Sequence, residues 1–165
     1  MAFDCFLKID VIPGESTDDK HKDWIELLSY SHGLSQPSSG SVSSGGARSA
    51  ERCDHQDFSV VKTLDKTSPT LNLACCNGEH IAKIQVELCR ATGDKQKYME
   101  YILTDSIVSS VRPGGSAQGG EALPLEEVSF NYGKIEWIYT ETGHKAGEAG
   151  GTVKKSWDLV ANKGA

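Results

Sequence analysis

The sequence lacks the long apolar runs of membrane-spanning proteins, because no stretch approaches the roughly 18 apolar residues that a transmembrane helix needs. It also lacks an excess of positive charge. The 17 lysines and arginines are outnumbered by 23 aspartates and glutamates, and the net charge of −6 argues against binding to nucleic-acid phosphates. Residues 1–8 do not show the basic segment and apolar run of a signal peptide. We therefore expect a protein that folds in the cytoplasm, inserts into no membrane and binds no nucleic acid.

Sequence motifs of the common enzyme classes are also missing. There is no G-x-S-x-G turn for a nucleophilic serine and no G-x-G-x-x-G for a dinucleotide. The segment Gly151–Ser156 resembles the end of a phosphate loop only superficially, because the required glycine and lysine spacing is absent. The five histidines are scattered, and such histidines are far more often solvated or hydrogen-bonded than catalytic. We predict that the protein is not an enzyme and binds no cofactor.

Cysteine occurs in an odd number, so the five thiols cannot all pair within one chain. Free and mostly buried thiols are expected in a reducing cytoplasm. A metal site could combine the segment around Cys53 and His55 with Cys75, Cys76 and His80. Zinc sites normally show local C-x2-C or H-x3-H pairs, and neither spacing occurs here. We predict no metal site, and an enzyme site around Cys53, His55 and His80 is kept as an alternative for the structure to test.

The segment 128–139 is a long strand that changes face halfway. Its apolar residues occupy even positions before Gly133 and odd positions after it: Val128, Phe130 and Tyr132, then Ile135, Trp137 and Tyr139. Side chains alternate between the two faces of a strand, so a slip of one residue moves the apolar set to the other face. A glycine at the slip indicates a bulge or a sharp bend. The pattern predicts a curved, closed or nearly closed β-structure.

Other segments show the same two-residue period. Strands are predicted over 3–11, 58–63, 81–88, 98–103, 107–111 and 153–160. The apolar residues of 98–103 and 107–111 share one phase, which would place Met99, Leu103, Ser109 and Val111 on the same face. The segment 24–30 fits both a helical face and a strand.

One helix is predicted over Ser68–Asn77. Ser68 suits the N-cap, Pro69 suits the first helical position, and Gly78 suits a left-handed C-terminal cap. A helix this short must be held by packing on a sheet. Several strands and one helix without βαβ alternation predict a mostly antiparallel β fold in a single domain, 1–165.

Three segments rich in glycine or serine are predicted to be loops. They are a long flexible loop at about 34–50 and glycine-rich loops at about 112–121 and 143–151. A loop as long as the first is normally functional or disordered. One interpretation is a flexible hairpin without a function. The other is an arm that becomes ordered only against another subunit.

Short motifs, in order along nearly the whole chain, resemble the Hcp (haemolysin-coregulated protein) family. They are Phe6–Asp10, Gly14–Ser16, His21 with Trp24, Ile25, Leu28 and Ser29, Gly33–Pro37, Asp57–Phe58, Asp65–Pro69, Gly78, Val128–Phe130, Lys134–Tyr139 and Trp157–Leu159 with Asn162. The stretches 38–52 and 141–151 match only as variable loops. The resemblance therefore rests on the order of the motifs.

This resemblance implies a tight antiparallel β-barrel of two packed sheets with one short helix, and it favours a strand over 24–30. It further implies that six copies close into a ring and that rings stack into the inner tube of the bacterial type VI secretion system. Contraction of a sheath would expel this tube. The implied partners are the protein itself, the spike protein, the sheath and baseplate, and effector proteins in the ring lumen. The protein would be secreted by this system without a signal peptide.

Two surfaces are candidates for these contacts. The candidate ring-stacking loop comprises Gly33, Leu34, Ser35, Gln36, Pro37, Ser38, Ser39, Gly40 and Arg48. The candidate effector contact in the lumen comprises the polar helix residues Thr70, Asn72 and Asn77. The simpler interpretation of the helix is that Leu71, Leu73 and Ala74 pack it on the sheet without touching cargo. The alternative to a tube subunit is a monomeric β-barrel that binds a small ligand.

Overall fold

The computed structural model describes residues 2–39, 49–91, 93–120, 123–142 and 149–165. In chain order, the elements of these ranges are β1 (Phe3–Ile9), β2 (Ile25–Leu27), β3 (Ser29–Ser31), β4 (Leu34–Ser35), β5 (Ser38–Ser39), β6 (Ser49–Ala50), β7 (Asp54–His55), β8 (Phe58–Thr63), α1 (Ser68–Asn77), β9 (Ile81–Arg90), β10 (Lys97–Gly114), β11 (Leu125–Thr142), β12 (Ala149–Asp158) and β13 (Lys163–Gly164). The described part of the chain contains no helix of the length and apolarity that a membrane crossing requires.

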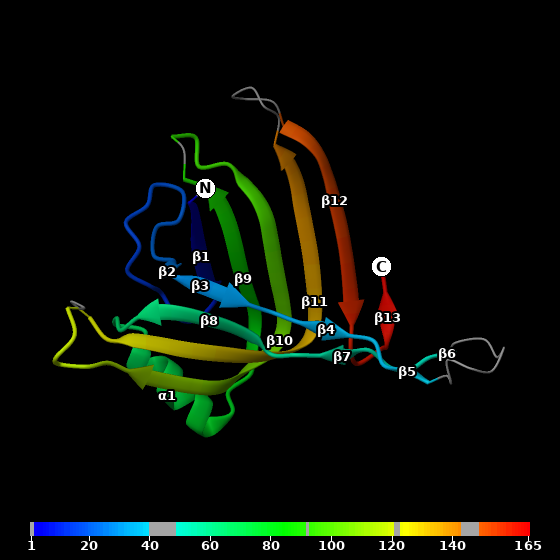
Figure 1. Ribbon diagram of the computed structural model, residues 1–165, viewed down its shortest axis with the longest axis horizontal. Helices are drawn as coiled ribbons and strands as arrows, with labels where there is room; N and C mark the ends of the chain where they lie inside the picture. Colours follow the sequence, from blue (N-terminus) through cyan, green and yellow to red (C-terminus); the bar gives the residue numbers. More distant parts are fainter. Residues whose placement is uncertain (1, 40–48, 92, 121–122, 143–148) are drawn as a thin grey trace.

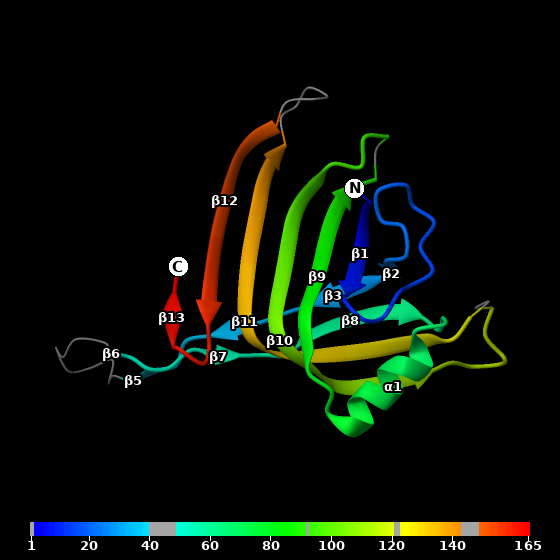
Figure 2. The ribbon, with the colours of Figure 1, turned by 180° about the vertical axis from the view of Figure 1, so that it is seen from behind.

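Strands β10 and β11 bend midway, and each therefore belongs to two sheets (Figure 1). The first sheet contains β12, the second half of β11, the first half of β10, then β9, β1 and β2. The second sheet contains the second half of β10, the first half of β11, then β8 and β3. Figure 2 shows the two layers from behind, with α1 beside the second sheet. The core lies where the layers face each other.

Core residues come from both sheets. Leu7, Val86 and Leu103 of the first sheet are completely buried, and so are Phe58 and Phe130 of the second. They belong to one cluster of buried apolar side chains. Burial of this apolar surface is the main source of stability for the fold.

The predicted change of face at Gly133 is confirmed. Phe130 and Tyr132 are buried before the glycine, and Ile135 is buried after it. Trp137 packs partly against the core, whereas Tyr139 is nearly half exposed because the strand has by then run past the core. The strand stays continuous through the bend.

The matching bend in β10 does not follow the predicted pattern. The single phase expected from Met99 to Val111 is wrong, because buried Leu103 is followed by buried Ser106 and Val108. Asp105, between them, has a left-handed φ of 51° and lies opposite Gly133. The register also shifts between Val108 and Ser110, which leaves Ser109 exposed.

The two sheets do not close into a continuous barrel. Strand β2 pairs with β1, whereas β3 pairs with β8, and only Leu28 separates them. The chain passes from one sheet to the other at this residue, whose side chain is 59% exposed. The expected mostly β fold of two packed sheets with one helix is confirmed, without barrel closure. The ambiguous segment 24–30 is a pair of short strands.

Several strand and loop boundaries in the structure differ from those predicted from the sequence. The loop expected from 112 begins later, because β10 stays paired with β11 as far as Gly114. The last long strand is Ala149–Asp158 and not 153–160, because Thr152 and, beyond a register shift, Ala149 also pair with β11. The first strand ends at Ile9, where the chain turns back to form a bridge with Ile12.

Helix α1 has the predicted bounds, but Ser68 is not its N-cap. Thr67 occupies that position without a side-chain cap, and Ser68 is the first helical residue. Gly78 has a φ of 63°, and its N–H donates to Ala74 O, which confirms the left-handed cap. Leu71 and Ala74 are buried as expected, whereas Leu73 is 62% exposed and faces away from the sheet.

The start of α1 is fixed to the second sheet by a buried lysine. Lys62 Nζ of β8 lies 2.7 Å from Glu126 Oε2 of β11 and 2.9 Å from Asp65 Oδ1. The Ser68 hydroxyl donates to Glu126 Oε2 at 2.7 Å and lies 3.3 Å from Lys62 Nζ. Lys62 and Glu126 are fully buried, and each charge would destabilise the fold without the opposite charge of its partner. This network determines where the helix begins.

Replacement of Lys62 with methionine is expected to lower the free energy of unfolding by about 3 kcal/mol, because Glu126 is left buried without its cation. The double variant Lys62→Met, Glu126→Leu is expected to recover much of this loss. Urea unfolding at a fixed protein concentration measures both values. Lys83→Met, at an exposed position of β9, is the control. A loss of unfolding free energy in Lys62→Met no larger than that in Lys83→Met would contradict the stabilising role of the Lys62–Glu126 pair.

Candidate assembly and cargo surfaces

The chain between Gly33 and Gln56, named the arm below, is paired only with itself among the described residues. Strand β4 pairs with β7, and β5 pairs with β6, in two short ladders separate from the two main sheets. The arm projects away from these sheets (Figure 1). The ring-stacking candidates Gly33–Ser39 lie on β4, β5 and the residues beside them, and Gly40 and Arg48 lie outside the described residues.

The root of the arm is held by backbone contacts. The N–H of Gln56 donates to Gly33 O at 3.0 Å, and the N–H of Glu51 donates to Pro37 O at 3.3 Å. The Gln36 side-chain amide also donates to Glu51 O. A Cβ at Gly33 would lie 2.5 Å from Gln56 Oε1, so a side chain there would displace Gln56. The Gly33–Pro37 motif therefore lies where the two limbs of the arm are held close together.

Aromatic side chains and two histidines connect this root to the core. The His32 ring lies 5.5 Å from the Phe58 ring and 5.8 Å from the Tyr132 ring, measured between centroids. Both His32 ring nitrogens are buried without a hydrogen-bond partner among the described residues. Burial, together with neighbouring His55, lowers the pKa of His32. His55 Nδ1 lies 3.0 Å from the Tyr132 hydroxyl oxygen, and burial lowers the pKa of His55 as well.

The helix presents the predicted polar residues to solvent. Thr70, Asn72 and Asn77 are all exposed, and exposed Leu73 adds an apolar side chain to the outer surface of the helix. Asn77 also has a structural contact, because its Oδ1 accepts the Glu79 N–H at 3.0 Å. This surface therefore offers both polar and apolar contacts to another molecule.

Strand β12 forms an edge of the first sheet. On its outer side, β13 pairs with Trp157 and Asp158, and Ala165 exchanges two backbone hydrogen bonds with Ser156. Within the described residues no strand pairs with the outer side of 149–155. An unpaired edge is a template for pairing with another chain. Lys155 is exposed beside this edge, whereas Lys154 Nζ lies 3.4 Å from Glu136 Oε1 of β11.

An open groove of about 460 Å³ lies near the N-terminus, at the far end of the first sheet. Phe3, Tyr98 and Tyr139 give it an apolar lining, and the Arg90 guanidinium donates to Thr142 Oγ1 at its side. The groove lies at the rim of the sheet, whereas the space between the sheets is filled by core side chains. It is not the enclosed lumen that a ligand-binding barrel would require.

The Cys/His alternative fails on geometry. His80 Nδ1 lies 3.0 Å from Asp105 Oδ1, and the His80 side chain is 76% exposed. His55 instead contacts Tyr132, and the Cys53 thiol contacts Asp54 O. These residues form no common metal-ligand group in the described part of the chain. The group that does form, His21 with Glu87 and Cys89, was missed because it joins a loop to a distant strand.

A sequence profile described as "Type VI secretion system effector, Hcp" matches residues 6–139. The chain belongs to the Hcp family. It is 37% identical over 163 residues to protein hcp1 of Pseudomonas aeruginosa, with 98% of each chain covered. The major exported protein of the same organism is 26% identical over 140 residues, which cover 79% of this chain and 77% of that protein.

Solved Hcp structures share the fold. A type six secretion system protein superposes with a TM-score of 0.92 at 33% identity and covers 99% of this chain and 100% of its own. Hcp1 from Salmonella typhimurium superposes with a TM-score of 0.82 at 34% identity, with both chains fully covered. The two-sheet fold with one helix that the motifs implied is therefore confirmed, without closure of the barrel.

Family membership establishes the general role of the protein. Hcp proteins are structural, secreted components of the type VI secretion tube, so this chain is a tube subunit that assembles with itself and not an enzyme. Hcp relatives are exported by this system, and the name of one of them records the export. The predicted function is confirmed at this level.

Acidification is expected to destabilise the fold through His32 and His55. The folded state lowers both pKa values below the ordinary 6.5, so the unfolded chain binds more protons as the pH falls through this range. The free energy of unfolding is therefore expected to keep its full value above pH 6.5 and to fall as the pH drops towards the lowered pKa values. Urea unfolding between about pH 8 and pH 5 measures this decline.

A histidine-specific effect can be separated from general acid sensitivity. His32→Phe keeps an aromatic ring in the pocket and is expected to flatten the decline. His80→Gln, at an exposed position, is expected to leave it unchanged. Identical pH profiles for His32→Phe and the unmodified chain would count against the role of His32.

Proposed function

We propose that six copies of this chain close into a ring and that rings stack head to tail, with the arm of each subunit contacting the next ring. The observation that carries this proposal is the arm itself. It projects from the two main sheets. Among the described residues its strands pair only within the arm, β4 with β7 and β5 with β6. Isolated two-stranded hairpins are marginally stable at best, so such an arm is suited to order against another subunit.

Ring closure is attributed to the sheet edges. The outer side of 149–155 is available for pairing, and this surface differs from the surface formed by the second sheet and α1. An interface between two unlike surfaces closes into a ring when its rotation allows. The two faces of such a ring also differ, which permits stacking in one direction.

The wider partners follow from the same role. We propose that the tube contacts the type VI spike protein, the sheath and the baseplate, and that sheath contraction expels it. Synthesis in the bacterial cytoplasm, followed by release to the medium or a target cell, completes the proposal. Its support is family membership.

Effector cargo is assigned to the exposed helix surface. Thr70, Asn72 and Asn77 offer hydrogen-bonding groups, and Leu73 offers an apolar contact between them. Leu71 and Ala74 hold the helix on the sheet, so the outer residues are not needed for that packing. The proposal places this surface toward the ring lumen.

Deletion of Ser38–Gly46 is expected to leave six-membered rings intact but to abolish their stacking and secretion, because the stacking contact is removed. Light scattering and negative-stain images measure ring mass and stack length, and the culture supernatant measures secretion. Deletion of Ser116–Gln118, in the loop after β10, is the control. Unchanged stacking and secretion without Ser38–Gly46 would refute the role of the arm, and a monomer at micromolar concentration would refute the ring.

The double variant Thr70→Ala, Asn72→Ala is expected to reduce effector co-purification at least about tenfold, which corresponds to about 1.4 kcal/mol of lost binding free energy. Asn77 is left unchanged because of its contact with Glu79. The readout is the amount of effector recovered with tagged rings from the producing bacterium. Thr17→Ala with Gln118→Ala, two exposed positions elsewhere, is the matched control. Equal recovery from both double variants would rule out this surface.

A further inference from the structure

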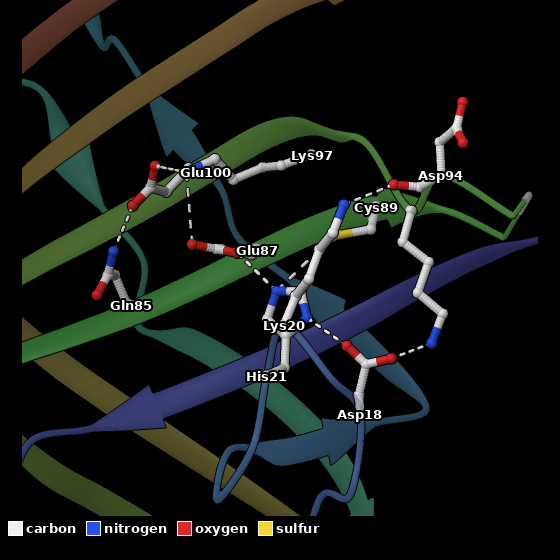
Figure 3. A network of polar contacts seen from close by, with 10 residues as sticks. Asp18, Lys20, His21, Gln85, Glu87, Cys89, Asp94, Lys97 and Glu100 are labelled. Atoms are coloured by element: carbon white, nitrogen blue, oxygen red, sulfur yellow. Dashed lines mark hydrogen bonds and ion pairs between the residues drawn. The ribbon is translucent and has the colours of Figure 1, made fainter. Parts of the chain in front are cut away.

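A polar cluster around His21 is used neither by the arm nor by the helix surface (Figure 3). In the described ranges, His21, Glu87 and Cys89 form the group of metal-type side chains whose ligand atoms all lie within 4.8 Å of one another. His21 comes from the loop between β1 and β2. Glu87 and Cys89 come from β9, two residues apart, so both face the same side of that strand. His21 from the loop thus completes a set of three possible metal ligands, of which the other two lie on β9.

The ligand atoms of this group are close together and shielded from solvent. His21 Nε2 lies 2.7 Å from Glu87 Oε2 and 3.9 Å from Cys89 Sγ. His21 and Cys89 are buried, and the Glu87 side chain is only 12% exposed. Nitrogen, carboxylate oxygen and sulfur are the three ligand types that zinc takes from proteins. The chemistry of the donors therefore fits a borderline-soft divalent cation.

The imidazole ring is already oriented for ligation. It stacks on Phe6 at a centroid distance of 4.0 Å, and Trp24 packs against it edge-on at 4.8 Å. Asp18 Oδ2 lies 2.8 Å from Nδ1, which directs Nε2 toward Glu87 and Cys89. Metal-binding histidines commonly donate their second nitrogen to a carboxylate in this way.

The surrounding charges accommodate a divalent cation. Lys95 pairs with Asp18, and Lys97 Nζ lies 2.8 Å from Glu100 Oε2 and 3.4 Å from Glu87 Oε1. The carboxylates of Asp18 and Glu87 lie beside the imidazole ring, so negative charge that favours a bound cation flanks the group.

We propose that His21 Nε2, the Glu87 carboxylate and the Cys89 thiolate bind one divalent cation of the zinc class, with a fourth position open to water. Such an ion would cross-link the loop between β1 and β2 to β9 and stabilise the folded chain, because metal-binding free energy adds to folding free energy. The inference is independent of ring stacking and of cargo binding.

Cys89 binds the ion as a thiolate, and a bound cation deprotonates a coordinating thiol. Metal binding is therefore accompanied by proton release.

The test uses the full chain, treated with a chelator and titrated with Co²⁺ and then with Zn²⁺. One equivalent of Co²⁺ per chain is expected to produce a thiolate-to-cobalt absorption band, which Zn²⁺ then removes by displacing the cobalt. Cys89→Ala and Glu87→Gln are expected to abolish or strongly weaken the band. Asp18→Asn is expected to weaken affinity by about tenfold or more, since it removes the carboxylate that orients His21.

Two other cysteines serve as controls. Cys5→Ala changes another buried thiol, and Cys76→Ser changes an exposed one, and both variants are expected to keep the band. Circular dichroism confirms that each variant is folded, and Glu87→Gln, which keeps the side-chain shape, decides the matter where Cys89→Ala does not fold. Absence of metal uptake by the folded chain overturns the proposal, as does a band unaffected by both Cys89→Ala and Glu87→Gln. Light scattering of the same samples distinguishes loss of metal from loss of the ring.

Discussion

The shared bend of β10 and β11 is the constraint on which the rest of the structure depends. Each of these strands is 18 residues long, and a straight pair of that length could form only one side of a core. Asp105 takes a left-handed φ opposite Gly133, and both strands change face there. Because the bend places the halves in different sheets, two continuous strands supply both walls of one core. The wall positions of β8, β9 and β12 then follow from pairing with one half or the other.

This division also separates the functional surfaces. The arm joins β3 to β8, and α1 follows β8 through the buried Lys62–Glu126 pair, so both are attached to the second sheet. The loop that carries His21 contacts Glu87 of β9 in the first sheet, and the open edge of β12 belongs to the same sheet. The arm and the His21 cluster are therefore attached to different sheets.

Much of this architecture could be predicted from local patterns. Gly133 marks a bend because only a phase slip explains the apolar positions on both sides of it, and Pro69 with Gly78 delimits the helix. The bend at Asp105 has no such signal, since a positive φ is uncommon for any residue other than glycine and nearby Ile107 is apolar and only partly buried. The His21 cluster was missed for a different reason. Its partners lie 66 and 68 residues away in sequence, and motif spacing detects only ligands that are close along the chain.

The arm has a consequence for the mechanics of a tube. Its ladders β4–β7 and β5–β6 are two residues long, so ordering each arm against a neighbour costs conformational entropy and makes the single contact weak. In the proposed ring of six, six such contacts would engage together and multiply in effect. Adhesion between complete rings would then be strong, whereas a damaged ring or a lone subunit would hold poorly. A tube built this way would stay rigid while its rings are whole and would come apart ring by ring once its ends are exposed.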